Sequence, residues 1–513
     1  MKLQEIIVPV CLSLGTVWLL SYFFGPRQIE ENAGVRPGQE FSVMKTAQMC
    51  YPVNTEIDFY DEHKKTVPVI TEVDGYDTSM DFSSGGAVLN RLVFKRNLAG
   101  INGTIVTTES PLITERHKGV WLVALQDTSP YDFKLISQKR DKDQQVLSYE
   151  SVTKQAKITK KFIISLDKYQ VDCVITVEPL DKNSPVQPRI FVPGPFMTEL
   201  GSSEHVSAVV FTDRESLKKI SPEHTVDVAW ASPRIVGVEN RYFLYAMVND
   251  KNNFTQRAYF KHDEGHRLTA VLEGPSVTET TTWCLSFYCG PKEASQLSAV
   301  DQRLEEVMDY GYLAPVSKFL LYVLNFIYSY VHNYGWAIII LTLLMRLIML
   351  PFAQRGKRKL KQGSEITQKL RYIEQKYKDD PEALSQAKME VMRKYGFSPL
   401  SGCLPILIQF PVFIALNFAL RNSIELYQAP FIFWIKDLSA KDPYHVIPAL
   451  IGISSFFALS ASSKDPRHKV AMLVVSLFIA GAMAYLSAGL GLFIGVSSVL
   501  GALENRYMPG SAS

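Results

Sequence analysis

Long apolar runs alternate with stretches of mixed composition along the chain. Each run is long enough, or nearly long enough, to cross the hydrocarbon core of a bilayer as a helix. The runs occupy residues 6–24, 334–353, 403–421, 443–461, 469–486 and 488–505. The first lies in residues 1–24 and is followed by GPRQIEEN without a small-x-small cleavage site, which favours an uncleaved anchor. The pattern predicts a multi-span α-helical membrane protein with six transmembrane helices, five of them in a C-terminal block.

A different pattern fills residues 25–310. Short segments such as KKFIISL, VDCVITVEP and WCLSFYCG are rich in β-branched and aromatic residues, and Gly, Pro, Asp and Asn separate them. Segments of this kind are typical of strands. Because this region lacks long helical periodicity, we expect a large all-β sandwich domain.

Residues 311–333 carry a third pattern, which is clearest in VSKFLLYVLNFIYSYVH. The more polar positions recur at spacings of four and three residues, which places them on one helical face. They are Lys318, Tyr322, Asn325, Ser329 and His332, and the opposite face holds Phe319, Leu320, Val323, Leu324, Ile327 and Val331. This predicts an amphipathic helix lying in the membrane interface, with a packed helix of the β-domain as the alternative.

Two shorter amphipathic repeats make up residues 354–402. Apolar residues recur at helical spacing on both sides of the sequence KDDPE, at Ile366, Leu370, Ile373 and Tyr377, then at Leu384, Ala387, Val391 and Tyr395. Asp380 is suited to cap the second helix, Pro381 to its first turn and Gly396 to its end. We expect a helical hairpin whose two narrow apolar stripes pack against each other.

Charge orients these segments. The whole chain has a net charge of only +3, which indicates no specificity for nucleic acid. Residues 354–402, however, hold twelve Lys and Arg against six Asp and Glu, a net charge of +6. Short loops rich in Lys and Arg stay on the cytoplasmic side of a membrane. With six spans, both termini, including the tail at 506–513, are then cytoplasmic and residues 25–310 lie outside.

The basic residues of the hairpin have two interpretations. They form a solvated loop, or they are a landing site for acidic lipid, the ribosome or targeting factors. The candidates for the second are Lys369, Arg371, Lys376, Lys388 and Arg393.

The cysteines point to no metal or redox chemistry. Four of the six, Cys50, Cys173, Cys284 and Cys289, lie in the predicted β-domain, where a disulfide is permitted. We expect them mainly as small buried apolar residues, and one disulfide stays open as an alternative. The sequence has no CxxC or Cys/His metal spacing and no GxxxxGK[ST] loop, so we expect no cofactor.

One charged residue stands inside the second apolar run. Arg346 lies in ILTLLMRLIMLP, and Thr342 precedes it by one helical turn on the same face. Because no Asp or Glu lies in the core of any run, Arg346 has no evident ion-pair partner. It either snorkels to the cytoplasmic interface or lines a water-filled recess as an uncompensated positive charge. Other polar residues within the runs are Gln409, Ser454, Ser455, Ser497 and Ser498.

The C-terminal block resembles the YidC/Oxa/Alb family of membrane protein insertases, in its Gram-negative type with a large periplasmic domain. The segments that carry the resemblance are NYGWAIIILTLLMRLIMLP, YGFSPLSGCLPILIQFPVFIALNFALRNSIELYQAPFIFWIKDLSAKDPY and SAGLGLF. Residues 25–310 resemble the family's periplasmic β-supersandwich in placement and length, and in YCGPK and RYFLYAMV. Two features depart from the family pattern. Phe493 and Ile494 stand where tyrosine is frequent, and the tail ENRYMPGSAS has one arginine, which argues against ribosome contact through the tail.

The resemblance implies five core spans around a hydrophilic groove that is open to the cytoplasm and to lipid. It places Arg346, Thr342 and Gln409 in that groove, and Ser454 and Ser498 are further candidates because they lie inside the spans. It also implies a surface along which client helices slide into lipid, at Phe410, Phe413 and Met483.

The implied function is that of a non-enzymatic insertase and chaperone of the inner membrane. Its partners would be nascent inner-membrane proteins, membrane lipid and the Sec translocon, with the ribosome or targeting factors at the hairpin. One rival is a transporter or anion channel that uses Arg346 as a selectivity charge, but inverted repeats and paired broken helices are not seen. A second rival is an envelope enzyme acting on sugars through the β-domain, for which no carboxylate pair stands out.

Overall fold

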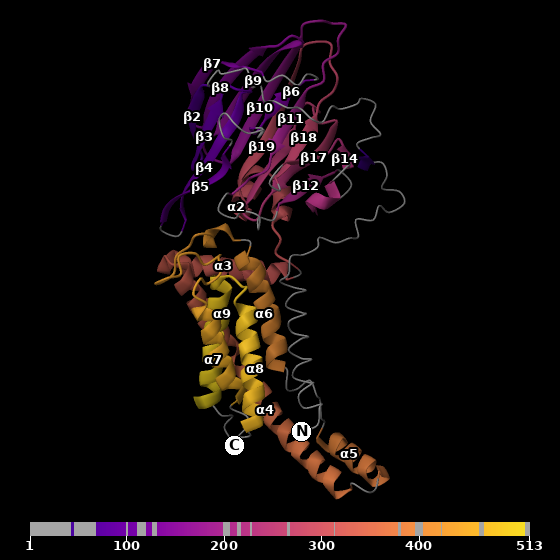
Figure 1. The fold of residues 1–513 in the computed structure, drawn as a ribbon, viewed down its shortest axis with the longest axis vertical. Coiled ribbons are helices and arrows are strands. Elements are labelled where there is room, and N and C mark those ends of the chain that lie inside the picture. Colours follow the sequence, from indigo (N-terminus) through magenta and orange to yellow (C-terminus); the bar gives the residue numbers. More distant parts are fainter. Residues whose placement is uncertain are drawn as a thin grey trace.

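A computed structural model describes most of the chain. The described residues are 43–45, 68–98, 101–109, 119–125, 131–197, 206–212, 217–225, 228–263, 267–311, 313–377, 381–395, 404–421, 423–460 and 466–507. The predicted anchor at 1–24, Cys50, Asp380, Gly396 and residues 508–513 of the tail lie outside them. Figure 1 shows a β-domain at one end of the molecule, helices at the other, and one helix, α3, lying across the junction.

Antiparallel strands build the β-domain, and three sheets are formed by the described residues. The largest sheet runs in the order β13 (Lys218–Ile220), β12 (Ser207–Phe211), β15 (Ile235–Glu239), β16 (Phe243–Asp250), β19 (Thr281–Pro291), β10 (Gln170–Pro179), β9 (Ala156–Ser165), β8 (Gln144–Val152) and β7 (Lys134–Arg140). The second runs β1 (Val43–Lys45), β14 (Val228–Ala231), β17 (Arg257–Asp263), β18 (Arg267–Glu273), β11 (Arg189–Pro193) and β6 (Leu122–Ala124). The third contains β2 (Ile70–Gly75), β3 (Thr78–Ser83), β4 (Val88–Leu98) and β5 (Ile101–Glu109).

Alternation of side chains explains why these segments form sheets. In β9 and β10 every second residue is buried, and the intervening residues are more exposed. Such a period of two places one face of a strand against a core. The prediction of an all-β domain is confirmed. Three of its cysteines, Cys173, Cys284 and Cys289, are free thiols, so no disulfide joins them.

A charged side chain lies within this apolar core. Lys160 occupies an inward position of β9 and is fully buried. Its Nζ donates to the carbonyl oxygens of Gly86 at 3.1 Å, Trp121 at 2.6 Å and Ala87. These hydrogen bonds join β9 to two distant loops and replace the water that the ammonium loses on burial.

The helices follow the β-domain in the chain. Short elements come first or lie in connections: η3 (Pro222–Thr225), α2 (Ala294–Val300), η4 (Gln302–Val307) and η6 (Ile424–Leu426). The longer ones are α3 (Ala314–Val331), α4 (Tyr334–Lys376), α5 (Pro381–Tyr395), α6 (Leu404–Arg421), α7 (Val446–Ser460), α8 (Pro466–Met483) and α9 (Ala488–Tyr507).

The second apolar run and the first arm of the hairpin are one helix. Helix α4 has 43 residues and continues through Pro351. The predicted boundary between span and hairpin lies at residue 353, but the helix has no break there. Proline removes one backbone hydrogen bond but is tolerated in membrane helices, where the freed groups find other partners. Figure 1 shows α4 extending well beyond the other helices, with α5 beside its far end.

One described segment is long and apolar enough to cross a membrane by itself, Tyr334–Pro351 of α4. Shorter apolar segments lie in the other helices, at Pro411–Arg421, Val446–Ser460, Lys469–Met483 and Ala488–Glu504. Length alone therefore supports one span within the described residues, and the expectation of six spans remains a prediction.

Helix α3 has the predicted amphipathic character but not the predicted faces. Leu320, Leu324 and Ile327 are buried against the bundle, as expected. The predicted division of α3 into a polar and an apolar face was wrong at Phe319. This side chain is 61% exposed and lies beside other exposed aromatic side chains, Tyr322, Phe326 and Tyr330. The spacing did not show that the fully buried ridge of α3 is as narrow as 320, 324 and 327, with Val323 and Val331 only partly buried beside it, which leaves this aromatic face outward.

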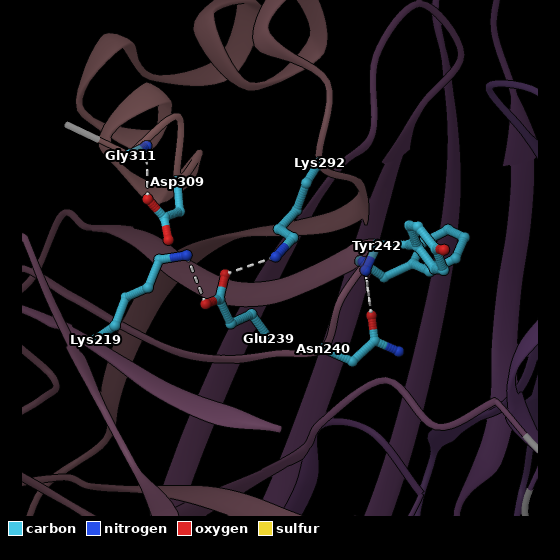
Figure 2. Close-up of polar contacts among 8 residues, drawn as sticks. Lys219, Glu239, Asn240, Tyr242, Lys292, Asp309 and Gly311 are labelled. Carbon is cyan, nitrogen blue, oxygen red and sulfur yellow. Dashed lines mark hydrogen bonds and ion pairs between the residues drawn. The ribbon is translucent and has the colours of Figure 1, made fainter. Parts of the chain in front are cut away.

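A polar cluster lies in the β-domain where β15 turns into β16. Figure 2 shows Glu239 between Lys219 and Lys292, at 2.8 and 3.1 Å, while Asn240 accepts a hydrogen bond from the Tyr242 backbone. Burial lowers the pKa of Lys292 to about 8, although Glu239 opposes that shift.

The same turn reaches the end of α6. The Arg241 Nε donates to the Arg421 carbonyl at 2.9 Å, and the rings of Tyr242 and Tyr427 lie 4.9 Å apart. Gly311, at a φ of +68°, packs against the ring of Phe418 where a Cβ would lie 2.6 Å from it. The β-domain is therefore packed against the helical part and is not merely tethered to it.

Candidate functional site

The candidate site is centred on Arg346, which lies five residues before the end of the membrane-length segment of α4 at Pro351. Its Nη2 donates to the carbonyl oxygen of Ser497 on α9 at 2.6 Å. Its Nη1 lies 3.9 Å from Oε1 of Glu504, about two turns further along the same helix. The side chains of Arg346 and Glu504 are 23% and 15% exposed, so both are largely removed from solvent.

The expectation of an uncompensated charge at Arg346 was therefore wrong. Glu504 lies in the last turn of the final apolar run, outside the core of that run, in which no Asp or Glu occurs. The side chain of arginine is long, and α9 packs against α4. Arg346 therefore contacts Glu504 across the interface between the two helices. The ion pair thus joins a residue from the middle of one helix to a residue near the end of the other.

Glycine makes this approach possible. A Cβ at Gly501 would lie 2.6 Å from Nη2 of Arg346. Residues 497, 501 and 504 are spaced by four and three, so they share one face of α9. The spacing of residues 497, 501 and 504 is visible in the sequence. It identifies the contact with Arg346 only when α4 is known to pack on that face of α9.

The hydroxyl groups predicted for the groove bond to their own helices. Thr342 is buried and donates to the Ile338 carbonyl at 2.6 Å. Ser454 donates to the carbonyl of Leu450 at 2.8 Å, and Ser498 is half-buried on α9. Hydrogen bonds to the preceding turn satisfy Thr342 and Ser454 without a partner across the bundle.

The predicted client slide is described only in part. Phe413 is half-buried on α6 and packs against the helical core, and Met483 is buried in that core. The side chains of Gln409 and Phe410 lie outside the described residues, although both belong to α6.

The hairpin arms are joined by an ion pair. Lys388 of α5 lies 2.7 Å from Glu374 of α4, and Lys376 lies over the ring of Tyr377. The side chains of Lys369, Arg371 and Arg393 lie outside the described residues. The two arms lie together, and the packing of their apolar stripes stays a prediction.

Apolar side chains cover the outer surface of the bundle. On α4 the exposed ones include Leu347 and Ile348, on α7 Ile453 and Phe457, and on α8 Val470, Val474 and Leu477. A water-soluble protein rarely exposes a contiguous apolar surface of this extent, whereas lipid solvates it without cost. The surface is that of a protein embedded in a membrane.

Comparison with known families gives two consecutive matches. Residues 120–323 match the model of the YidC periplasmic domain, and residues 326–511 match that of the 60Kd inner membrane protein. A membrane protein insertase YidC of Nitrosococcus oceani is 32% identical over 365 residues, which cover 69% of this chain and 67% of the relative. The chain belongs to the YidC family.

Other YidC relatives match over a smaller share of their length. The insertase of Thioalkalivibrio sulfidiphilus is 36% identical over 53% of this chain and 50% of its own, and that of Coxiella burnetii is 33% identical over 57% and 53%. The chain thus spans about half the length of these two relatives. Family membership makes it an inner-membrane protein with a periplasmic domain.

Solved structures give a weaker comparison. A crystal structure of an active YidC insertase covers 86% of this chain at 16% identity, and the match covers 93% of that chain, with a TM-score of 0.39. A putative aldose 1-epimerase from Escherichia coli covers 44% of this chain and 99% of its own at 11% identity, with a TM-score of 0.26. Both TM-scores are too low to support an argument about sugar chemistry or mechanism.

Proposed function

We propose that the chain inserts integral proteins into the inner membrane and assists their folding, alone or with the Sec translocon. The observation that carries the proposal is Arg346, a partly exposed guanidinium held within a bundle whose outer surface is apolar. Membership of the YidC family supports the same function. The groove itself, lined by Arg346, Thr342, Gln409, Ser454 and Ser498 and open to the cytoplasm, is part of the proposal.

The physical problem is the passage of a client's polar segment through hydrocarbon. Each unsatisfied backbone polar group costs several kcal/mol there. A hydrophilic groove that reaches halfway into the bilayer shortens the apolar path. Arg346 attracts acidic residues of the segment, while the client's apolar helix leaves sideways past Phe410, Phe413 and Met483 into lipid. Partition of that helix into lipid supplies the free energy, so no nucleotide is needed.

The spans, the hairpin, the β-domain and α3 have roles that fit this mechanism. The chain would cross the membrane six times, with both termini and the hairpin in the cytoplasm and the β-domain in the periplasm. The aromatic face of α3 would lie among the lipid headgroups, where aromatic rings are favoured. The basic hairpin would receive clients from the ribosome or from targeting factors.

Reconstitution tests this function against its rival. The purified chain in liposomes would be given a small client with one or two spans, and protease protection would measure the translocated segment. We expect protection well above that of empty liposomes, and protection equal to theirs would contradict insertion. The same vesicles loaded with an anion-sensitive dye would report a channel, for which we expect no flux above background.

A further inference from the structure

The contacts of Arg346 divide into one strong bond and one weak pair. The hydrogen bond to the Ser497 carbonyl is short, at 2.6 Å. The distance of 3.9 Å to Glu504 is too long for a hydrogen bond, so that pair rests on charge alone. The guanidinium is therefore held in place by the α9 backbone, and Glu504 balances its charge without occupying its donors.

Donor capacity remains on the guanidinium. A guanidinium carries five N–H donors in a fixed fork. The Nε of Arg346 is buried and has no hydrogen-bond partner in the described part of the chain. Two parallel hydrogen bonds to one carboxylate are the strongest arrangement available to arginine. A carboxylate that reaches this fork would thus bind better than Glu504 does at its observed distance.

The exposure and the charges of Arg346 and Glu504 fit an exchange in which another carboxylate replaces Glu504 at the guanidinium. Both side chains retain some exposure, 23% for Arg346 and 15% for Glu504, so neither is sealed in the bundle. A single buried charge without a partner is costly, and the carboxylate of Glu504 near Arg346 reduces that cost. The resting protein then keeps Arg346 neutralised until another anion arrives.

We propose that Glu504 is the resident counter-ion of Arg346, and that an acidic residue of a client segment displaces it. This inference rests on the proposed insertase function. Glu504 then acts as a positioning residue that sets how strongly Arg346 prefers acidic over neutral segments. Its removal should strengthen that preference, whereas a merely structural glutamate would affect both kinds of segment alike.

Peptide binding to the purified full chain in detergent tests the counter-ion directly. The probe is a labelled apolar peptide with two aspartates, and its partner has asparagines in their place. We expect Glu504→Gln to tighten binding of the aspartate peptide about two- to fivefold, the range expected of a partly exposed ion pair, and to leave the asparagine peptide unchanged. Glu504→Asp, which withdraws the carboxylate by one methylene, should shift the ratio in the same direction by less.

Two further variants serve as controls. Glu390→Gln removes the same charge from an exposed position of α5 and should leave the ratio unchanged. In an Arg346→Gln background, Glu504→Gln should have no further effect on the ratio, because coupled residues are not additive. An unchanged ratio in Glu504→Gln, or the same change in the absence of Arg346, would overturn the proposal.

Insertion assays separate this proposal from the function on which it rests. Clients with acidic and with neutral translocated segments would be compared in the liposomes described above. We expect Glu504→Gln to raise the ratio of acidic to neutral insertion. If the wild-type chain inserts neither client, the proposed function fails, and peptide binding still decides whether Glu504 competes for Arg346.

Discussion

Lys160 is the residue whose chemistry departs most from its surroundings. Burial lowers the pKa of this lysine from 10.5 to about 7. Between these two values the unfolded chain binds more protons than the folded chain. Stability therefore rises with pH across that window, by at most about 1.4 kcal/mol per pH unit. Below about pH 7 both states are protonated and this contribution is constant.

Substitution of Lys160 tests this dependence. Lys160→Met should destabilise the β-domain because the carbonyls of Gly86, Ala87 and Trp121 lose their donor, at a cost of about 1–3 kcal/mol per unsatisfied group. The difference between wild type and variant should widen from pH 7 to pH 10. Urea unfolding of the detergent-solubilised chain, followed by tryptophan fluorescence at several pH values, measures it.

The neighbouring lysine is the control. Lys161 is exposed on the opposite face of β9, so Lys161→Met should change neither stability nor its pH dependence. A constant difference between wild type and Lys160→Met across the pH range would show that Lys160 does not titrate in the folded chain.

The burial of Lys160 could be predicted from the sequence, but its hydrogen-bond partners could not. Alternation in AKITKKFIIS places Lys160 on the same face as Ile158 and Phe162, so its burial followed from the strand prediction. Its acceptors did not, because they lie 39 or more residues away in the chain. Glu504 was missed for a similar reason, since only the packing of α9 on α4 brings it to Arg346.

Among the elements, the helices at the C-terminus depend on small residues. Glycines of α9 lie where neighbouring segments come close: a Cβ at Gly491 would lie 3.0 Å from Ile447 of α7, and one at Gly489 would lie 3.1 Å from the Leu438 carbonyl in the connection before α7. Close backbone approach of this kind drives helix association in membranes, where the hydrophobic effect is absent. The apolar pattern predicted these helices, but not which faces they share.

Two glycines of the bundle make a matched pair. A Cβ at Gly452 of α7 would lie 2.9 Å from the Ala480 Cβ, whereas none at Gly481 of α8 would meet an atom within 4 Å. Gly452→Ala should lower stability by about 1–3 kcal/mol through overpacking. Gly481→Ala should raise it slightly, since alanine favours a helix by about 1 kcal/mol over glycine. Thermal unfolding in detergent measures the stability of both variants, and an equal change in the two would contradict the packing of α7 on α8.

Helix α5 packs against the far end of α4 and forms the hairpin with it. Its arms are joined to each other through Lys388 and Glu374. Replacement of residues 365–394 by a short flexible linker should leave the thermal stability of the bundle unchanged and should impair client insertion in liposomes. Normal insertion by the shortened chain would show that the hairpin is only a connection.

For the whole molecule, the β-domain and the helices were both predicted, but their junction was not. Ile424 and Tyr427, from the connection after α6, are buried in the same core as the strands. Sequence patterns report one element at a time, and a contact between residues 242 and 427 leaves no local signal. The sequence did not show that α4 continues past residue 353, because a change from apolar to basic residues does not by itself end a helix.

Removal of the β-domain tests how far the two parts depend on each other. A chain that lacks most of residues 25–299 but keeps 300–332 should still insert most clients, because Arg346 and its partners lie in the helices. Its melting temperature should fall, since Ile424 and Tyr427 lose their cover. Loss of insertion with unchanged thermal stability would show a direct role of the β-domain in insertion.

Topology is tested by labelling of intact cells. Ser385 of α5 and Lys139 of β7 are both exposed, so a cysteine at either position should react if reagent reaches it. We expect Lys139→Cys to react from outside and Ser385→Cys to react only after the membrane is opened, with the unsubstituted chain as background. Reaction of Ser385→Cys in intact cells would contradict the predicted orientation.

The unbroken course of α4 has a mechanical consequence. Between Pro351 and Lys376 the helix is a rod of about 37 Å, at 1.5 Å per residue. Proline is where a helix bends most readily. A bend of about 10° at Pro351 would carry the far end through about 7 Å and leave Arg346, on the other side of the bend, in place. A bulky particle that binds the hairpin could therefore displace it without disturbing the guanidinium.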